Sequence, residues 1–258
     1  MIEIIISVIA FMIGTVLGSF FTLAVYRIPL KQNITHERSY CPKCNHKLKF
    51  LDLIPVLSYV FLKGKCRYCS EKIRPRYLIL ELCSGFIFML YILSLKIDYI
   101  NFQIGDMINC IFGVIYLSVL AITAGINLEK RNITKSLITF TTVLSLIYML
   151  YLYVLGANMY RYIIYLVIII SLLLINKLKQ NDTLDIIIYI LLILLYIGTT
   201  SAIVSIILTF MVIAIKNLYN IIKKKKETKV MAIATIFSII TIIIMILQNY
   251  ITVRWWNE

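Results

Sequence analysis

Four cysteines in two C-x-x-C pairs are the residues whose types and spacing most clearly predict chemistry. Cys41 and Cys44 form the first pair, and Cys66 and Cys69 form the second after 21 intervening residues. Each pair can offer two thiolates to one edge of a tetrahedral zinc ion, although the gap between the pairs is slightly longer than is usual. The sequence predicts a structural zinc site, and two metal-free structural or redox pairs are the other interpretation.

The rest of the chain is too apolar for a soluble protein. Of its 258 residues, 61% are apolar and 15% are charged, and the mean hydropathy is +0.93. A soluble domain of this composition would have too few polar residues to cover its surface. We therefore expect an all-α polytopic membrane protein of about eight transmembrane helices, with a small zinc-knuckle domain in the cytosol.

Eight apolar runs are the candidate transmembrane helices, and most reach the roughly 20 residues that a bilayer requires. The run at 185–198 is short, and its boundary with the next run could instead be a kink. We expect a first transmembrane helix at 1–26, a cytosolic four-cysteine zinc domain at 27–76 and a seven-helix membrane domain at 77–258. The runs are 4–26, 77–97, 104–126, 136–156, 159–176, 185–198, 199–221 and 230–250.

The net charge of +14 is concentrated between the apolar runs. With both termini outside, the inner segments and Lys216 hold 23 of the 26 Lys and Arg residues. This asymmetry follows the positive-inside rule, so we expect the cysteines in the reducing cytosol, where a metal is favoured over disulfides. Basic loops also suit anionic membrane lipid, and the distribution argues against nucleic-acid binding. The inner segments are 27–76, 127–135, 177–184 and 222–229.

A series of short motifs resembles the bacterial prepilin peptidases. Gly18-Ser19-Phe20 followed by Arg27-Ile28-Pro29 resembles the opening motif of this family. The cysteine pairs continue the match, and Leu78 stands where the family usually has proline. The resemblance is specific across residues 14–85 and weaker beyond them, and the family's eight-span topology agrees with the one expected above. The other matching positions are Ile54-Pro55, Ser58, Gly64, Ile73, Arg76-Tyr77 and Glu81.

The resemblance implies a bifunctional enzyme of type IV pilus and type II secretion systems in the bacterial inner membrane. Such an enzyme cleaves the basic leader of prepilins or pseudopilins at the cytosolic membrane face and methylates the new N-terminus. It implies zinc, and S-adenosylmethionine as methyl donor, although the sequence carries no glycine-rich nucleotide-binding motif. Glu81 is implied in the peptidase or methyl-transfer site, or it is a structural partner of Arg76 or a nearby lysine.

The family's peptidase chemistry uses two aspartates at cytosolic helix ends. One carboxyl of such a pair holds a proton and acts as an acid, while the other acts as a base toward water. Asn127 occupies the first of these positions here, within an otherwise similar Asn127-Leu128-Glu129 context. Asp182 is the candidate for the second position because it lies in a polar turn, and Asp185 competes with it because its spacing to Gly198 fits the family's pattern.

Asn127 bears directly on activity. An amide has nearly the shape of a carboxylate, but it has no acidic proton to share and accepts none at neutral pH. The resemblance therefore implies a chain that binds substrate and does not cleave it, either as an engineered Asp→Asn variant or as a natural diverged member. The alternative function is a non-catalytic prepilin-binding membrane protein.

Overall fold

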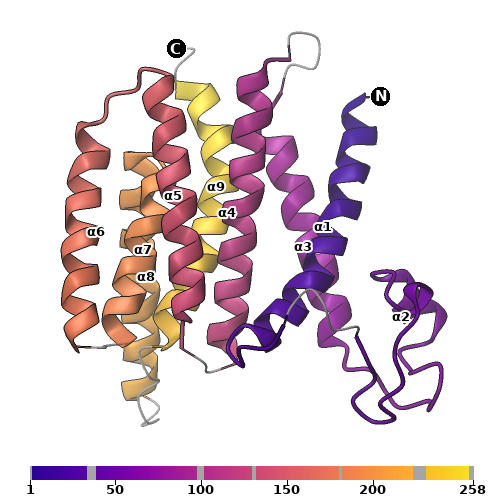
Figure 1. Ribbon diagram of the computed structural model, residues 1–258. Coiled ribbons are helices and arrows are strands. Elements are labelled where there is room, and N and C mark those ends of the chain that lie inside the picture. Colours follow the sequence, from indigo (N-terminus) through magenta and orange to yellow (C-terminus); the bar gives the residue numbers. More distant parts are fainter. Residues whose placement is uncertain are drawn as a thin grey trace. The chain divides into compact units, whose positions relative to one another are not determined.

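The computed structural model describes residues 2–33, 39–97, 102–129, 132–179, 182–222 and 231–255. These residues are helical apart from connecting segments and isolated β-bridges, and they contain no named strand. Eight long helices correspond to the eight apolar runs (Figure 1). They are α1 (Ile2–Arg27), α3 (Arg76–Ser94), α4 (Ile104–Leu128), α5 (Lys135–Val154), α6 (Tyr160–Lys179), α7 (Asp182–Tyr196), α8 (Thr199–Ile222) and α9 (Met231–Trp255).

Six of these helices are long and apolar enough to cross a membrane within the described residues: α1, α3, α4, α5, α6 and α8. The apolar stretch of α9 is described over Ile233–Gln248, and α7 has 15 residues. At 1.5 Å per residue α7 is about 22 Å long, shorter than the hydrocarbon core of roughly 30 Å. The expectation of an all-helical polytopic membrane protein is confirmed.

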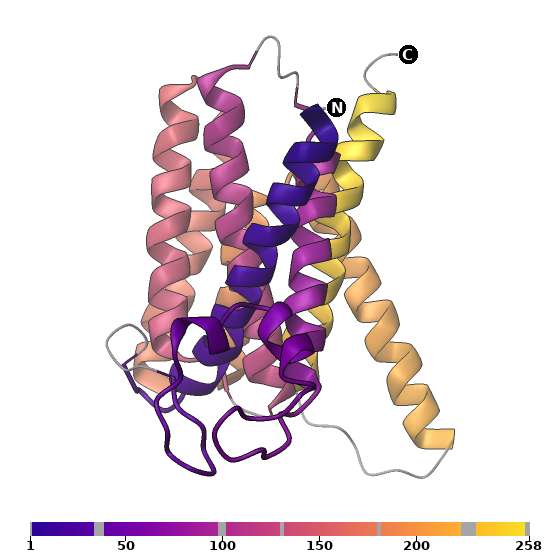
Figure 2. The same cartoon turned by 90° about the vertical axis from the view of Figure 1, so that its right-hand side faces the viewer.

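The junction between α7 and α8 is a reversal of the chain. α7 ends at Tyr196, and α8 begins at Thr199 after Ile197 and Gly198. Figures 1 and 2 show α8 running back toward the end of the bundle at which α7 begins. Of the two interpretations of this boundary, separate helices and a kink, the structure has separate helices.

The chain divides into two compact units, residues 1–110 and 111–258. In the first unit, α1 and α3 pack antiparallel through small residues. A Cβ added to Gly18 would lie 2.7 Å from the Ser84 Cβ, and one added to Gly14 would lie 2.9 Å from the Gly85 Cα. Small residues at this spacing let two membrane helices approach closely. The packing holds the end of α1 beside the start of α3, so the connecting segment begins and ends at one place.

Two short elements lie in the connection between α1 and α3. They are the 3₁₀ turn η1 (Phe50–Asp52) and the one-turn helix α2 (Leu57–Phe61). Residues 39–75, called the cysteine segment below, contain both elements and all four paired cysteines. Little of this segment is regular structure, so its order depends on specific contacts.

The core of the second unit contains an aromatic cluster shared by α4, α5 and α7. Tyr116 of α4 is fully buried and stacks on Tyr196 of α7, with ring centroids 4.1 Å apart. Its hydroxyl lies 3.1 Å from the hydroxyl of Ser145 in α5. A buried phenol requires such a polar partner, and this one joins the three helices.

Candidate metal centre and polar membrane site

The first C-x-x-C pair lies in a tight turn, residues 40–47, called the first knuckle. The Cys41 N–H donates to the His46 carbonyl at 3.0 Å, and the Asn45 N–H donates to the Cys41 carbonyl at 2.8 Å. Asn45 has φ = 55°, a left-handed conformation that asparagine adopts more readily than most residues. A single bridge between Tyr40 and Lys47 closes the turn.

The second pair repeats this turn in residues 65–72, called the second knuckle. The Cys66 N–H donates to the Glu71 carbonyl at 2.8 Å, and the Ser70 N–H donates to the Cys66 carbonyl at 2.9 Å. Ser70 has φ = 58°, and a bridge between Lys65 and Lys72 closes the turn. The two knuckles therefore present their cysteines in the same way.

The four cysteine sulfurs meet in one place with a geometry that fits zinc. All four Sγ atoms of Cys41, Cys44, Cys66 and Cys69 lie within 4.8 Å of one another. The Sγ atoms of Cys41 and Cys69 are 3.8 Å apart. A tetrahedron with Zn–S bonds of about 2.3 Å has S–S edges of about 3.8 Å, whereas a disulfide measures about 2.05 Å. All four thiols are free, so the donor set suits a structural zinc ion.

The thiols differ in acidity because they share one small space. The hydrogen bond from the Cys44 backbone N–H lowers the pKa of Cys41 to about 7. The Glu71 N–H also lowers the pKa of Cys69, but burial and contacts with the other three thiols raise it to about 12. A metal ion replaces these protons, so zinc binding to the site releases protons.

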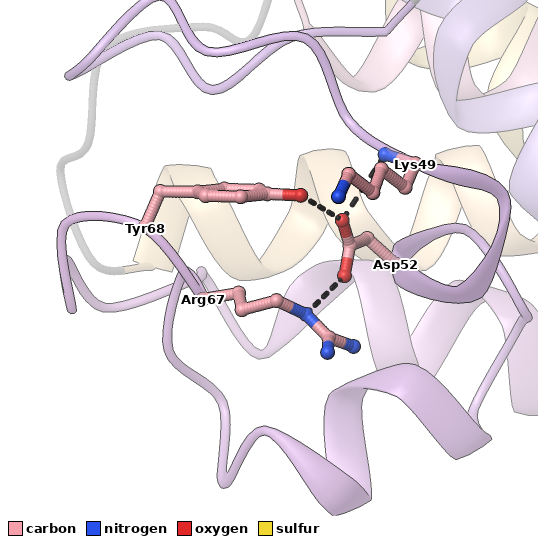
Figure 3. Close-up of polar contacts among 4 residues, drawn as sticks. All are labelled: Lys49, Asp52, Arg67 and Tyr68. Atoms are coloured by element: carbon pink, nitrogen blue, oxygen red, sulfur yellow. Dashed lines mark hydrogen bonds and ion pairs between the residues drawn. The ribbon is translucent and has the colours of Figure 1, made fainter.

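Asp52 connects η1 to the second knuckle (Figure 3). Its carboxylate accepts hydrogen bonds from Arg67 Nε at 2.6 Å, from the Tyr68 hydroxyl at 3.0 Å and from the Lys49 N–H at 3.1 Å. Burial raises the pKa of Asp52, but these hydrogen bonds outweigh burial and hold the pKa below its ordinary value. Arg67 and Tyr68 are the two residues between Cys66 and Cys69, so Asp52 supports the turn that carries two of the four sulfurs.

Tyr68 also contacts the first knuckle. Its ring stacks on the imidazole of His46, with centroids 3.6 Å apart. This contact and the hydrogen bonds to Asp52 hold the two knuckles and η1 together around the sulfurs. Sequence reasoning missed Asp52, Tyr68 and His46, since none belongs to the C-x-x-C pattern.

Glu81 anchors the cysteine segment to α3. The Val56 backbone N–H donates to Glu81 Oε2 at 2.8 Å. Val56 has φ = 62° and ψ = −53°, and the Leu57 N–H donates to the Pro55 carbonyl at 2.6 Å, which defines a γ-turn. A β-branched residue at positive φ is strained, and the half-buried Glu81 carboxylate holds it.

The structure shows a partner for Glu81 that was not expected, a backbone amide. Within the described part of the chain, no ion pair joins Glu81 to Arg76 or to a lysine, and the Arg76 guanidinium lies over the Tyr77 ring, 5.3 Å from its centroid. Sequence reasoning could not identify a backbone amide as the partner, because every residue type except proline can supply one. A role for Glu81 in peptidase or methyl-transfer chemistry stays a prediction.

Asn127 lies in the last turn of α4 and is buried. Its side-chain oxygen accepts a hydrogen bond of 3.1 Å from the Thr235 hydroxyl of α9. Farther along the same helix, the Ser238 hydroxyl lies 3.3 Å from the hydroxyl of Tyr189 in α7. Sequence reasoning missed Thr235. The three-residue spacing of Thr235, Ser238 and Thr241 in an apolar run was the signal that could have found it, because it places the hydroxyls along one side of a helix.

Asp182 and Asp185 lie in the first turn of α7, and each accepts a hydrogen bond from an asparagine. Asn132, just after α4, donates to Asp182 Oδ2 at 2.7 Å, and Asn176 of α6 donates to Asp185 Oδ1 at 2.5 Å. Asp182 is exposed, whereas Asp185 is half-buried. Among the described residues no hydrogen bond joins Asn127 to either aspartate. The structure connects Asp182 to the segment that follows Asn127.

Comparison with known proteins finds a family model that matches the first part of the chain. Residues 12–95 match the family described as Bacterial Peptidase A24 N-terminal domain. The chain is 32% identical over 133 residues to a "Prepilin leader peptidase/N-methyltransferase" of Klebsiella pneumoniae, which covers 49% of this chain and 54% of the relative. The protein of the same name in Bacillus subtilis is 33% identical over 132 residues, 51% of this chain and 50% of that protein.

The chain also matches the "Prepilin leader peptidase/N-methyltransferase" of Vibrio cholerae, over a shorter stretch and at higher identity. It is 41% identical over 97 residues, covering 34% of this chain and 38% of the relative. These matches span about half or less of each curated relative, and no solved structure matches the chain. The predicted resemblance is confirmed: residues 12–95 match the bacterial peptidase A24 N-terminal domain, and the chain is similar to the prepilin leader peptidases.

Proposed function

We propose that this protein is a prepilin leader peptidase and N-methyltransferase of the bacterial inner membrane. The match of residues 12–95 to a peptidase family carries the proposal. The substrates are type IV prepilins or pseudopilins, which dock as apolar helices with their basic leader in the cytosol. The zinc segment and the active-site ends of α4 and α7 then face the cytosol, as the charge distribution favours.

The proposed peptidase site consists of Asn127, in place of the first aspartate, and Asp182, with Asp185 as the alternative second residue. An aspartate at position 127 would share a proton with its partner and activate water for attack on the scissile carbonyl. The amide of Asn127 keeps the hydrogen bond with Thr235 and has no proton to share. The chain with Asn127 is therefore expected to bind prepilin without cleaving it.

The support for zinc differs from the support for S-adenosylmethionine. Cys41, Cys44, Cys66 and Cys69 would hold zinc, which orders the cysteine segment and has no assigned part in cleavage. S-adenosylmethionine would supply the methyl group for the new N-terminus, and the resemblance alone supports it. We assign it no binding residues, because the sequence lacks a glycine-rich nucleotide-binding loop.

A cleavage assay in nanodiscs tests the peptidase. The chain with Asn127 and its Asn127→Asp form are incubated with a prepilin, and leaderless product is measured by mass. We expect product only from the Asp form. Asp182→Asn and Asp185→Asn, each added to Asn127→Asp, serve as matched variants, and the second aspartate is the one whose loss abolishes cleavage. If the Asn127→Asp form has normal helicity and yields no leaderless product, the proposed peptidase activity is contradicted.

The alternative function is a non-catalytic protein that binds prepilins. The hydrogen-bonded amide of Asn127 favours it, since the buried side-chain oxygen of the asparagine has a partner in Thr235. This function predicts stable co-purification with prepilin and no cleavage after Asn127→Asp. Absence of prepilin binding would contradict both functions.

A further inference from the structure

The cysteine segment carries large apolar side chains on its surface. In α2, the exposed fractions of Leu57, Val60 and Phe61 are 53%, 59% and 79%. In η1, those of Phe50 and Leu51 are 82% and 63%. This set, called the apolar edge, belongs to a segment outside the membrane-spanning helices. Apolar side chains gathered in this way mark a surface that another apolar phase covers.

The start of α2 is held beside the first turns of α3. Val56, its N-cap residue, is hydrogen-bonded to Glu81, which follows the first residue of α3 by five positions. Five residues of helix correspond to about 7.5 Å. α3 is a membrane-spanning helix, and Figures 1 and 2 both draw α2 level with its first turns. Interfacial helices bury their apolar face about 5–10 Å into the headgroup and acyl boundary.

A cationic hollow lies directly beside α2. It has a volume of about 350 Å³ and is lined by Tyr59 with Lys63, Lys65, Lys72 and Arg74. Among the described residues no ion pair involves these four cations. Four cationic residues therefore line the hollow, and such a cluster attracts anionic headgroups.

Gly64 keeps the hollow open at its Tyr59 side. It has φ = 67°, and an added Cβ would lie 2.8 Å from the Tyr59 hydroxyl. A side chain at this position would be strained and would displace the tyrosine. The backbone of the turn that follows α2 therefore determines the shape of the hollow.

We propose that the cysteine segment docks on the anionic lipid interface of the membrane. The apolar edge inserts at the acyl boundary, and the four cations of the hollow bind lipid phosphates. Charge selects this occupant, because the cations would repel a basic peptide and attract an anionic bilayer surface. The tether of the segment to α1 and α3 keeps it at that surface. This inference does not depend on peptidase activity.

Depth-dependent fluorescence of the full chain in nanodiscs tests the proposal. The two native tryptophans are replaced by phenylalanine, and one tryptophan is introduced by Phe61→Trp. The matched control is Lys43→Trp, on the exposed face of the first knuckle. With brominated acyl chains in anionic lipid, we expect blue-shifted and strongly quenched emission from position 61 and water-like, unquenched emission from position 43.

A second comparison tests the charge. The substitutions Lys63→Gln, Lys65→Gln, Lys72→Gln and Arg74→Gln should each weaken docking on anionic lipid by about fivefold. Replacing the anionic lipid by neutral lipid should weaken docking of the parent chain in the same direction. Bound zinc, measured in every variant, reports whether the segment remains folded. Water-like emission at position 61 with zinc retained would overturn the proposal. Blue-shifted emission without lipid quenching would also overturn it, since protein would then cover the apolar edge.

Discussion

Gly18 shows how a motif residue acts through packing. Its Cα faces Ser84 and Glu81 of α3, and an added Cβ would lie 2.7 Å from the Ser84 Cβ and 3.1 Å from the Glu81 Cα. The glycine of the family-like Gly18-Ser19-Phe20 motif therefore sets the spacing of two membrane helices. It also lets Glu81 reach the backbone of the cysteine segment.

Gly18→Ala should destabilise the first unit by about 1–3 kcal/mol, because the added methyl group overpacks the α1–α3 contact. Thermal unfolding in detergent measures the effect. Gly198→Ala is the matched control, since its Cβ would meet only Gln248 at 3.4 Å, an ordinary contact. Equal stability of the two variants would contradict this packing.

Asp52→Asn should weaken zinc binding by about tenfold, as expected for loss of an outer-shell group that orients metal ligands. The substitution removes the ionised partner of Arg67 and Tyr68 and leaves the four sulfurs in place. Competition with a chromogenic chelator gives the affinity. Asp106→Asn, at the first turn of α4, is the control, and an affinity unchanged by Asp52→Asn would show that Asp52 does not support the site.

At the scale of elements, the two knuckles and the long helices are stabilised by different interactions. The long helices have apolar faces that a membrane or a neighbouring helix covers. The knuckles have turns, short bridges and a buried carboxylate, which is little for a segment of this size. A bound metal would therefore supply much of the order of the cysteine segment.

Cys44→Ser should reduce bound zinc from about one equivalent to near zero, because three thiolates and a hydroxyl form a much poorer site. Amide hydrogen exchange should then rise across residues 39–75. Cys83→Ser is the matched control, since Cys83 lies in α3 outside the sulfur cluster. Full zinc retention by Cys44→Ser would rule out a four-cysteine site.

The sequence predicted the elements well and their mutual contacts poorly. Hydrophobic run length identified the eight long helices of the described residues but not the short helix α2, and C-x-x-C spacing identified the four sulfurs, since both are local patterns. The contacts of Asn127 with Thr235 and of Asp185 with Asn176 were not predicted, because helix packing sets them and no local pattern encodes it. The reversal at Gly198 was ambiguous for the same reason, since a break in an apolar run does not give direction.

At the scale of the whole molecule, the distribution of cations along the chain predicts the orientation. Alkaline phosphatase fused after Lys96 should be active, and the same reporter fused after Glu129 should be inactive, because the positive-inside rule predicts the first position outside and the second in the cytosol. A cytosolic reporter at the same two positions is the control and should give the inverse result. Activity of the phosphatase at Glu129 would reverse the topology.

The antiparallel contact of α1 with α3 has a thermodynamic consequence for metal affinity. Joining the ends of a flexible chain of about 50 residues costs about 3.5 kcal/mol in chain entropy. The pairing of α1 with α3 already offsets that cost, so zinc would bind a segment whose ends are fixed. The two equilibria are then linked, and each favours the other. An excised cysteine segment should bind zinc more weakly than the same residues held between their helices, and zinc should in turn strengthen the pairing of α1 with α3.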